Sequence, residues 1–432
     1  MSTDTGTEIS TETGTATGTD TGADTGTDNE SSTGRGAPTR DITTPTPTDR
    51  QALLLARRAG ATPAYLYDRG ELRAAVARVR AASIEGAGLY YSLKANPHPG
   101  VVNALAPLVD GFDVCSRAEM ETALDSGTPA DRVLFTGPAK SRGEAAAALA
   151  AEVAVTVESP RQAALLAATA GELGIGGRAV IRLNTPYPAR VPGGEPSPNQ
   201  FGVDADDEAR VVETLRAGGL SVSGLQMFWG SQYADPAVVH AARVAMTTRA
   251  LACVDRFALE VDFVSVGGGI AMPWCDADPD VDWAAMATPL SALPDGAAGL
   301  PLVCEYGRSL VGPAGSLLTT VLDTKTVGGL RHVLVDAGMN HVMIASRLVA
   351  GNGRGEVRVR AVGAPPDAPT GPVRVTGPLC SQLDVLADGV LLPEVEPGDL
   401  LLFEGVGAYG PTFSPGGFLS REPAREVVHG DV

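Results

Sequence analysis

The sequence has very few lysines. Only three occur in 432 residues, Lys94, Lys140 and Lys325, whereas arginine supplies the rest of the positive charge. Lys94 stands in the stretch YYSLKANPHPG, between an apolar run and a proline-rich turn. A lysine amine can condense with an aldehyde, which an arginine guanidinium cannot usefully do. Lys94 is therefore a candidate reactive group, with a surface lysine at the end of a strand as the alternative.

Metal-binding patterns, paired cysteines and long apolar runs are also missing. With five histidines and no HxH or HExxH pattern, no metal site is predicted. No apolar stretch reaches 18 residues, so no membrane span is predicted. The cysteines are odd in number and form no CxxC pair, which favours free thiols in a reducing cytoplasm. They are Cys115, Cys253, Cys275, Cys304 and Cys380.

The N-terminal segment has almost nothing to bury. Seven acidic residues and no basic residue precede Arg35, in a tract rich in Thr, Gly, Asp and Ser. This composition predicts a disordered tail over residues 1–43, and nothing in it resembles a signal peptide. The net charge of −18 argues against nucleic acid as a partner, because phosphate binding needs clustered cations.

After the tail, short apolar runs alternate with alanine-rich helical stretches. Eight such runs follow one another, and each ends in glycine or polar residues. Alternating strands and helices with apolar strands indicate a parallel sheet, and eight units favour a closed (β/α)8 barrel over a doubly wound sheet. The runs cover residues 88–96, 111–116, 132–138, 153–159, 179–184, 224–232, 263–269 and 302–307.

The helical rhythm fades after residue 307. Segments such as SLLTTVLDTKTV, RHVLVDAG, PVRVTGPL and DLLLFEGVGAYG have the pattern of strands between Gly/Pro turns. The sequence therefore predicts a barrel over residues 70–306 and a β-rich domain formed by residues 44–69 and 307–432. The apolar segment 62–68 is expected to be a strand of this second domain.

Reactive side chains cluster where the barrel strands end, which is where barrel enzymes carry their chemistry. The triplet Gly267 to Gly269 lets backbone amides approach a phosphate, although glycine runs are mostly turns. Arg308 follows the next strand and suits a phosphate monoester. Glu305 is either half of a structural ion pair or a carboxylate that keeps a pyridine nitrogen protonated. With Lys94, these groups describe a pyridoxal phosphate site, whereas Lys140 is expected to be a solvated or phosphate-facing cation.

Ten motifs in order give the chain a resemblance to a known family over roughly residues 60–430. The chain resembles the fold-type III pyridoxal-phosphate decarboxylases, which include the diaminopimelate, ornithine and arginine decarboxylases. One such motif would be weak evidence, but ten in family order are specific. The motifs are YYSLKANP, GFDVCSRAEM, FTGPAKS, QFGVD, WGSQ, VSVGGGI, EYGRSLVGPAG, VDAGMN, GPLCSQLDVLA and GAYG.

The resemblance implies roles for residues of this chain. Lys94 would bind the cofactor aldehyde covalently, and Cys380 of a second subunit would protonate the substrate carbon after carbon dioxide leaves. A homodimer with shared active sites is therefore implied, although by itself Cys380 would be taken for a buried structural cysteine. The other implied cofactor contacts are Asp113, Phe228, Ser231, Gly267, Gly268, Gly269, Glu305, Arg308 and Tyr409, and the implied substrate contacts are Ser381 and Asp384.

Three positions depart from the family pattern. Phe228 stands where a histidine usually stacks on the cofactor, so stacking is kept without a titratable group. Ser381 replaces an acid that holds the distal amine of free diamines, and Ile344 replaces an arginine that holds the distal carboxylate of diaminopimelate. Free diaminopimelate, lysine, ornithine or arginine would therefore be poorly held.

The segments DAGMNHVMIASR, GPLCSQLDVLAD and GAYGPTFSPGGFLSREP resemble a natural-product and siderophore branch of the family. Members of that branch act on an amino acid already joined to a carrier protein or to citrate. The resemblance thus implies a cytoplasmic decarboxylase of a tethered acidic amino acid, such as a glutamyl or methylaspartyl thioester, with an acyl carrier protein as a partner.

Diaminopimelate decarboxylase of lysine biosynthesis is the alternative, and an amino-acid racemase on the same fold is another. Racemases of this fold place an arginine against the pyridine nitrogen, where this chain offers Glu305. A non-catalytic pyridoxal-phosphate carrier is the third class, and the complete β-rich domain argues against it.

Overall fold

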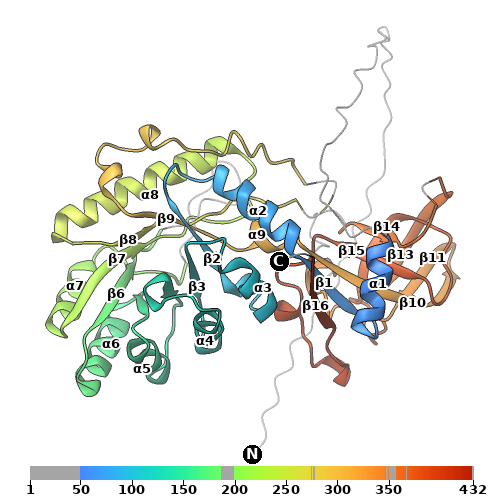
Figure 1. The fold of residues 1–432 in the computed structure, drawn as a ribbon, viewed down its shortest axis with the longest axis horizontal. Helices are drawn as coiled ribbons and strands as arrows, with labels where there is room; N and C mark the ends of the chain where they lie inside the picture. Colours follow the sequence, from blue (N-terminus) through green and yellow to red (C-terminus); the bar gives the residue numbers. More distant parts are fainter. Residues whose placement is uncertain are drawn as a thin grey trace, which may run out of the picture. The chain divides into compact units, whose positions relative to one another are not determined.

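The computed structural model describes residues 49–430, apart from 186–198, 274, 276–277, 347–348, 350–356 and 366. Within this part of the chain, eight parallel strands close into a barrel in sequence order, from β2 round to β9, which pairs with β2 again (Figure 1). The predicted (β/α)8 barrel is confirmed, whereas the tail predicted over residues 1–43 lies outside the described residues. The barrel strands are β2 (Gly88–Ser92), β3 (Gly111–Val114), β4 (Val133–Phe135), β5 (Ala154–Val157), β6 (Gly177–Arg182), β7 (Leu220–Gln226), β8 (Phe263–Ser265) and β9 (Leu302–Tyr306).

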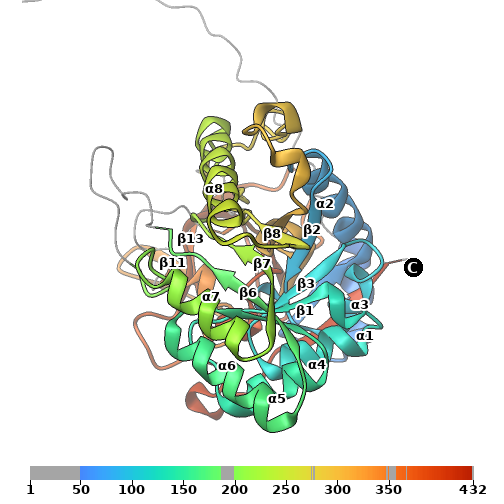
Figure 2. The same cartoon turned by 90° about the vertical axis from the view of Figure 1, so that its left-hand side faces the viewer.

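Helices surround the barrel wall (Figure 2). Three of them begin at a serine cap a few residues after a strand. The side chains of Ser116, Ser141 and Ser159 each accept a hydrogen bond from a backbone amide in the first turn of the helix that follows. These short connections keep the strand ends open on one side of the barrel. The helices are α2 (Arg69–Ala81), α3 (Pro99–Leu105), α4 (Arg117–Asp125), α5 (Arg142–Ala150), α6 (Pro160–Leu173), α7 (Glu208–Ala217), α8 (Pro236–Phe257) and α9 (Arg308–Val311).

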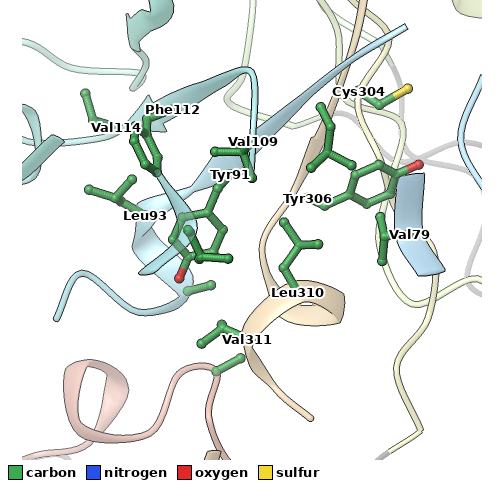
Figure 3. Packing of buried hydrophobic residues seen from close by; sticks show 14 of the residues in the cluster. Val79, Tyr91, Leu93, Val109, Phe112, Val114, Cys304, Tyr306, Leu310 and Val311 are labelled. Atoms are coloured by element: carbon green, nitrogen blue, oxygen red, sulfur yellow. The ribbon is translucent and has the colours of Figure 1, made fainter. Parts of the chain in front are cut away.

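Successive side chains along the barrel strands alternate between the packed core outside the barrel and the site inside it. Tyr91, Phe112 and Tyr306 pack outside the barrel wall with Leu310 and Val311 of α9 (Figure 3). Side chains next to them in the sequence face the other way, because successive residues of a strand point to opposite sides of the sheet. The same pattern that buries these three aromatic rings therefore turns Asp113, after Phe112, and Glu305, before Tyr306, towards the barrel interior.

A second sheet joins segments that are far apart in the sequence. In the described residues it has the order β12, β15, β10, β11, β13, β14, and β1 pairs with both β10 and β16. The β-rich second domain is thus confirmed, with the predicted early strand as β1. The sequence did not reveal helix α1 (Asp49–Ala59) or strands β12 (Val359–Ala361), β14 (Val385–Pro393) and β16 (Arg425–His429). The remaining strands are β1 (Ala64–Asp68), β10 (Gly315–Val327), β11 (Leu330–Val335), β13 (Thr370–Thr376) and β15 (Leu400–Glu404).

Helix α8 is long and apolar enough to cross a membrane, judged by length and composition alone. It nevertheless connects β7 to β8 on the barrel, and its Arg243 is 2% exposed. The Arg243 guanidinium donates hydrogen bonds to Thr288 Oγ1 at 2.7 Å, the Ala82 carbonyl at 3.0 Å and the Tyr306 hydroxyl at 3.1 Å. It also donates to the Met286 carbonyl. A buried cation with several protein acceptors identifies α8 as a barrel helix.

We expect Arg243→Met to lower the thermal unfolding midpoint by several degrees. The substitution leaves buried oxygens of three segments without their donor, and each such group costs about 1–3 kcal/mol. The matched control is Arg210→Met, because Arg210 makes an exposed ion pair with Asp207 at 2.7 Å that is worth at most about 1 kcal/mol. Equal melting temperatures for the two variants would contradict this account of α8.

Candidate active site

A cavity of about 330 Å³ lies at the carboxyl ends of the barrel strands. A larger hollow, of about 1100 Å³, lies at the opposite ends of the strands beside Asp131 and Arg178, away from the predicted site residues. The smaller cavity is therefore the candidate active site. It is lined by Lys94, Asp113, Cys115, Thr136, Gly137, Pro138, Ala139, Arg182, Phe201, Gln226, Phe228 and Glu305.

Lys94 follows β2 in a short helical turn, and its side chain is half exposed to the cavity. Its Nζ lies 3.9 Å from Oδ2 of the buried Asp113 on the neighbouring strand β3. Burial of the amine is the largest single effect and opposes its charge, but the Asp113 carboxylate and other acidic groups nearby together outweigh it, so the pKa of Lys94 is raised. Asp113 Oδ1 accepts a hydrogen bond from Thr136, whereas Oδ2 is buried without a hydrogen-bond partner and faces the lysine.

Glu305 faces the same cavity from β9. Its two carboxylate oxygens accept hydrogen bonds from Gln226 Nε2, at 2.8 and 3.1 Å. Burial and the nearby Asp113 carboxylate raise the pKa of Glu305 to about 7, against the effect of hydrogen bonds from Gln226 and Ser265. At neutral pH this carboxyl group is thus poised to accept or release a proton.

The glycine triplet lies between the strands that carry Ser265 and Glu305. A Cβ atom at Gly268 would lie 2.1 Å from the Glu305 carbonyl oxygen, so no larger residue fits there. Gly267 and Gly269 have positive φ values of 69° and 86°, which only glycine adopts readily. The close packing of this loop on β9 explains why the chain has three consecutive glycines at this place.

Arg308 begins helix α9, and its guanidinium carbon lies 4.5 Å from the ring centre of Tyr409. Tyr409 belongs to the loop after β15, and its backbone amide donates a hydrogen bond of 2.8 Å to the carbonyl oxygen of Ala95. The second domain thus contacts the turn that carries Lys94. Ser231, the remaining predicted phosphate contact, is exposed in the loop after β7, and Phe228 of the same loop lines the cavity.

Lys140 is neither solvated nor directed at a phosphate, so the expectation for this residue was wrong. Its Nζ donates hydrogen bonds to the carbonyl oxygens of Gly137 and Thr156, both at 2.8 Å, and to Thr156 Oγ1 at 3.0 Å. Burial lowers the pKa of Lys140 to about 8, although Glu158 favours the charged form. The lysine ties the cavity wall after β4 to strand β5, a role that nothing in the sequence pattern indicated.

The predicted residues of the second domain lie outside the cavity lining of their own chain. Cys380 is exposed and Ser381 is half-buried, in the loop between β13 and β14. Asp384 is 2% exposed, and its carboxylate accepts hydrogen bonds from the amides of Met339 and Leu379, at 2.7 and 2.8 Å. Within this chain Asp384 therefore shapes the loop, and the substrate contact expected for it stays a prediction.

Sequence reasoning missed Gln226 and Thr136. Gln226 ends β7, two residues before the predicted Phe228, and Thr136 directly follows β4. Their position at strand ends was the available signal. Glutamine and threonine are neutral and are seldom reactive groups, so their position alone did not indicate a role. Their importance is visible only in the structure, where they connect the two acidic groups.

The residues around the cavity fit pyridoxal phosphate. Lys94 supplies an amine that can bind an aldehyde, and Glu305 supplies a buried carboxylate that can hold a proton on a pyridine nitrogen. The buried Asp113 Oδ2, without a hydrogen-bond partner, faces the Lys94 amine. At the edge of the site, the tightly packed loop at Gly268 would bring its backbone amides close to a phosphate.

We expect the stability of the cofactor-free protein to fall between pH 5 and pH 8, in part because of Glu305. A carboxyl group with a raised pKa stays protonated in the folded chain while it ionises in the unfolded chain, so the folded state loses stability as pH rises from about 4.5 to about 7. The shift corresponds to at most about 3 kcal/mol. Chemical unfolding across this range should show a smaller decline for Glu305→Gln. An unchanged decline would refute the buried, protonated state of Glu305.

Several known proteins are similar to this chain in sequence and in fold. Residues 69–312 match the family model for the pyridoxal binding domain of pyridoxal-dependent decarboxylases. The chain is 30% identical over 364 residues to the diaminopimelate decarboxylase of Helicobacter pylori, covering 82% of this chain and 87% of that protein. It is 32% identical over 390 residues to the diaminopimelate decarboxylase of Pseudomonas fluorescens, covering 86% of this chain and 88% of that protein.

A solved structure agrees with these relatives. The crystal structure of the Helicobacter pylori diaminopimelate decarboxylase complexed with L-lysine superposes with a TM-score of 0.75 at 28% identity, covering 88% of this chain and 94% of that chain. Together with a cavity that offers a lysine amine and a buried carboxylate, these matches establish the cofactor as pyridoxal phosphate and the reaction as amino-acid decarboxylation. The chain belongs to the pyridoxal-dependent decarboxylases that include the diaminopimelate decarboxylases.

Proposed function

We propose that this decarboxylase acts on diaminopimelate or on an amino acid of similar build. The observation that carries the chemistry is the shared cavity of Lys94 and Glu305, with the Asp113 carboxylate 3.9 Å from the lysine amine. The bound cofactor supplies a ring that takes up the electrons released when the carboxylate leaves. The names of the relatives support diaminopimelate as the substrate. A place in lysine biosynthesis and a cytoplasmic location follow from this choice.

A tethered amino acid is the second candidate, favoured by two residues of this chain. Ile344, which stands where an arginine is expected for diaminopimelate, is 4% exposed in a short helical turn of the second domain. Ser381 stands where an acid is expected, and its hydroxyl accepts a hydrogen bond from the Leu383 amide at 3.2 Å. Without these charged groups, an amino acid linked to a carrier protein or to citrate avoids the burial of an unpaired distal charge.

We further propose that the enzyme works as a homodimer with shared active sites. Cys380 and Ser381 lie on an exposed loop outside the cavity of their own chain, so a partner subunit is needed for them to reach a substrate. Exposed apolar side chains on this domain support such an assembly, among them Leu383 at 43%, Leu391 at 65% and Phe413 at 56%.

Carbon dioxide release from two substrates separates the candidates. If the names of the relatives indicate the substrate correctly, free diaminopimelate should react faster, in kcat/KM, than a glutamyl thioester of an acyl carrier protein. Lys94→Ala protein controls for uncatalysed release. The reverse order of rates would assign the enzyme to tethered amino acids.

The Ser381→Glu variant tests whether the missing acid sets the substrate. Ser381→Gln is the control, because it has the same size without the charge. If the substrate is tethered, only the glutamate variant should gain activity on free diaminopimelate or ornithine.

Subunit mixing tests the dimer. Lys94→Ala and Cys380→Ala proteins should each be nearly inactive, whereas their mixed dimer contains one site with both residues intact. Random exchange should therefore restore about a quarter of the wild-type activity, since half of the dimers carry one intact site of two. No recovery, with exchange demonstrated by differently tagged chains, would show that each site is built from a single subunit.

A further inference from the structure

We propose that Gln226 is the residue that positions Glu305 towards the cofactor ring, by linking the Glu305 carboxylate through Thr136 to Asp113. Gln226 lies on β7, across the barrel from β3, which carries Asp113. This inference rests on the family's cofactor and not on the proposed substrate. Glu305 lies on β9 and Asp113 on β3, and Thr136 directly follows β4. The hydrogen bonds therefore run through the interior of the barrel.

Each N–H of the Gln226 side-chain amide has a hydrogen-bond acceptor. Gln226 Nε2 lies 2.8 and 3.1 Å from the two Glu305 oxygens and 3.4 Å from Thr136 Oγ1. The Thr136 hydroxyl in turn donates its own hydrogen to Asp113 Oδ1. One nitrogen with two hydrogens can therefore donate to both Glu305 and Thr136, which a hydroxyl or a single ring N–H cannot do.

Electrostatics explains why a neutral donor is useful at this point. Asp113 and Glu305 repel each other, and the Asp113 charge is among the causes that raise the pKa of Glu305. Gln226 stabilises the ionised Glu305 without adding a charge that would compete with Lys94 for the two acids. Gln226 is 2% exposed, so its hydrogen bonds are shielded from water and stronger for it.

The free acceptor of the same amide points to a second use. Gln226 Oε1 is buried without a hydrogen-bond partner, and Gln226 lines the active-site cavity. This acceptor is available to a donor that binds in the cavity, so the amide can hold Glu305 through Nε2 and a bound group through Oε1. The other titratable groups around Glu305 are Lys94, Asp113, Tyr90, Cys115 and Cys304.

The test measures the titration of Glu305 in the full chain by carbon-13 NMR of labelled glutamate, with the signal assigned by its loss in Glu305→Gln. In Gln226→Met, which keeps size but removes the amide, the midpoint should rise by about one pH unit, because a hydrogen bond to a charged group is lost. A midpoint within about 0.3 unit of wild type would overturn the proposal. Should that variant fail to fold, Gln226→Asn removes the same contact by its shorter reach.

Two further measurements distinguish positioning from a structural role. Thr136→Val should shift the Glu305 midpoint upwards, because the Asp113 carboxylate loses the hydroxyl that partly offsets its negative charge and so repels Glu305 more. Thr136→Ser keeps the hydroxyl and should match wild type. Thr247→Val, which removes an unpaired buried hydroxyl on α8, should leave the midpoint unchanged. In the cofactor-loaded enzyme, Gln226→Met should lower kcat at least about tenfold with little change in KM. Equal midpoints in the Thr136 pair would refute the link to Asp113.

Discussion

The repulsion between two buried carboxylates, Asp113 and Glu305, is the constraint on which this site depends. Burial and the Asp113 charge together hold the pKa of Glu305 near 7, and the same Asp113 raises the pKa of Lys94. Glu305 would hold a proton on the pyridine nitrogen of the cofactor, and Lys94 would hold its aldehyde, so both effects bear on groups that would contact the cofactor. The cofactor thus binds where the protein alone holds unbalanced charge.

The barrel and the second domain meet at the turn that carries Lys94. The Tyr409 amide donates to the Ala95 carbonyl at 2.8 Å, and the Asn96 side chain donates to the Gly407 carbonyl at 3.0 Å. Both contacts lie within two residues of the lysine. A barrel alone could hold a cofactor, but here the β-rich domain fixes the backbone around the reactive amine. This dependence gives a physical reason for the discontinuous second domain, whose first strand, β1, precedes the barrel in the sequence.

The sequence predicted the barrel, and with it the neighbourhood of Lys94, Asp113 and Glu305, because strand ends and apolar periodicity are local signals. It failed where function depends on contacts between distant segments. Lys140 carries a charge that suggested solvent or phosphate, yet its partners are carbonyl oxygens of Gly137 and Thr156 that only the folded wall brings together. The short edge strand β12 was missed because its three residues are too few to show an apolar period. Helix α1 was missed although Ala52, Leu55 and Ala59 are buried at helical spacing.

Catalysis and substrate choice belong to different parts of the molecule. The groups that serve the cofactor line a cavity inside the barrel, where the packing of Gly268 on Glu305 and the buried acids tolerate little change. Ile344 and Ser381, the positions expected to hold the distal end of a free substrate, lie in the second domain, outside that lining. A loop residue such as Ser381 can be exchanged without disturbing the barrel. Thirty per cent identity preserves decarboxylation. If the loop of Cys380 contacts the substrate in a dimer, as proposed, a change of substrate would need no change in the chemistry of Lys94.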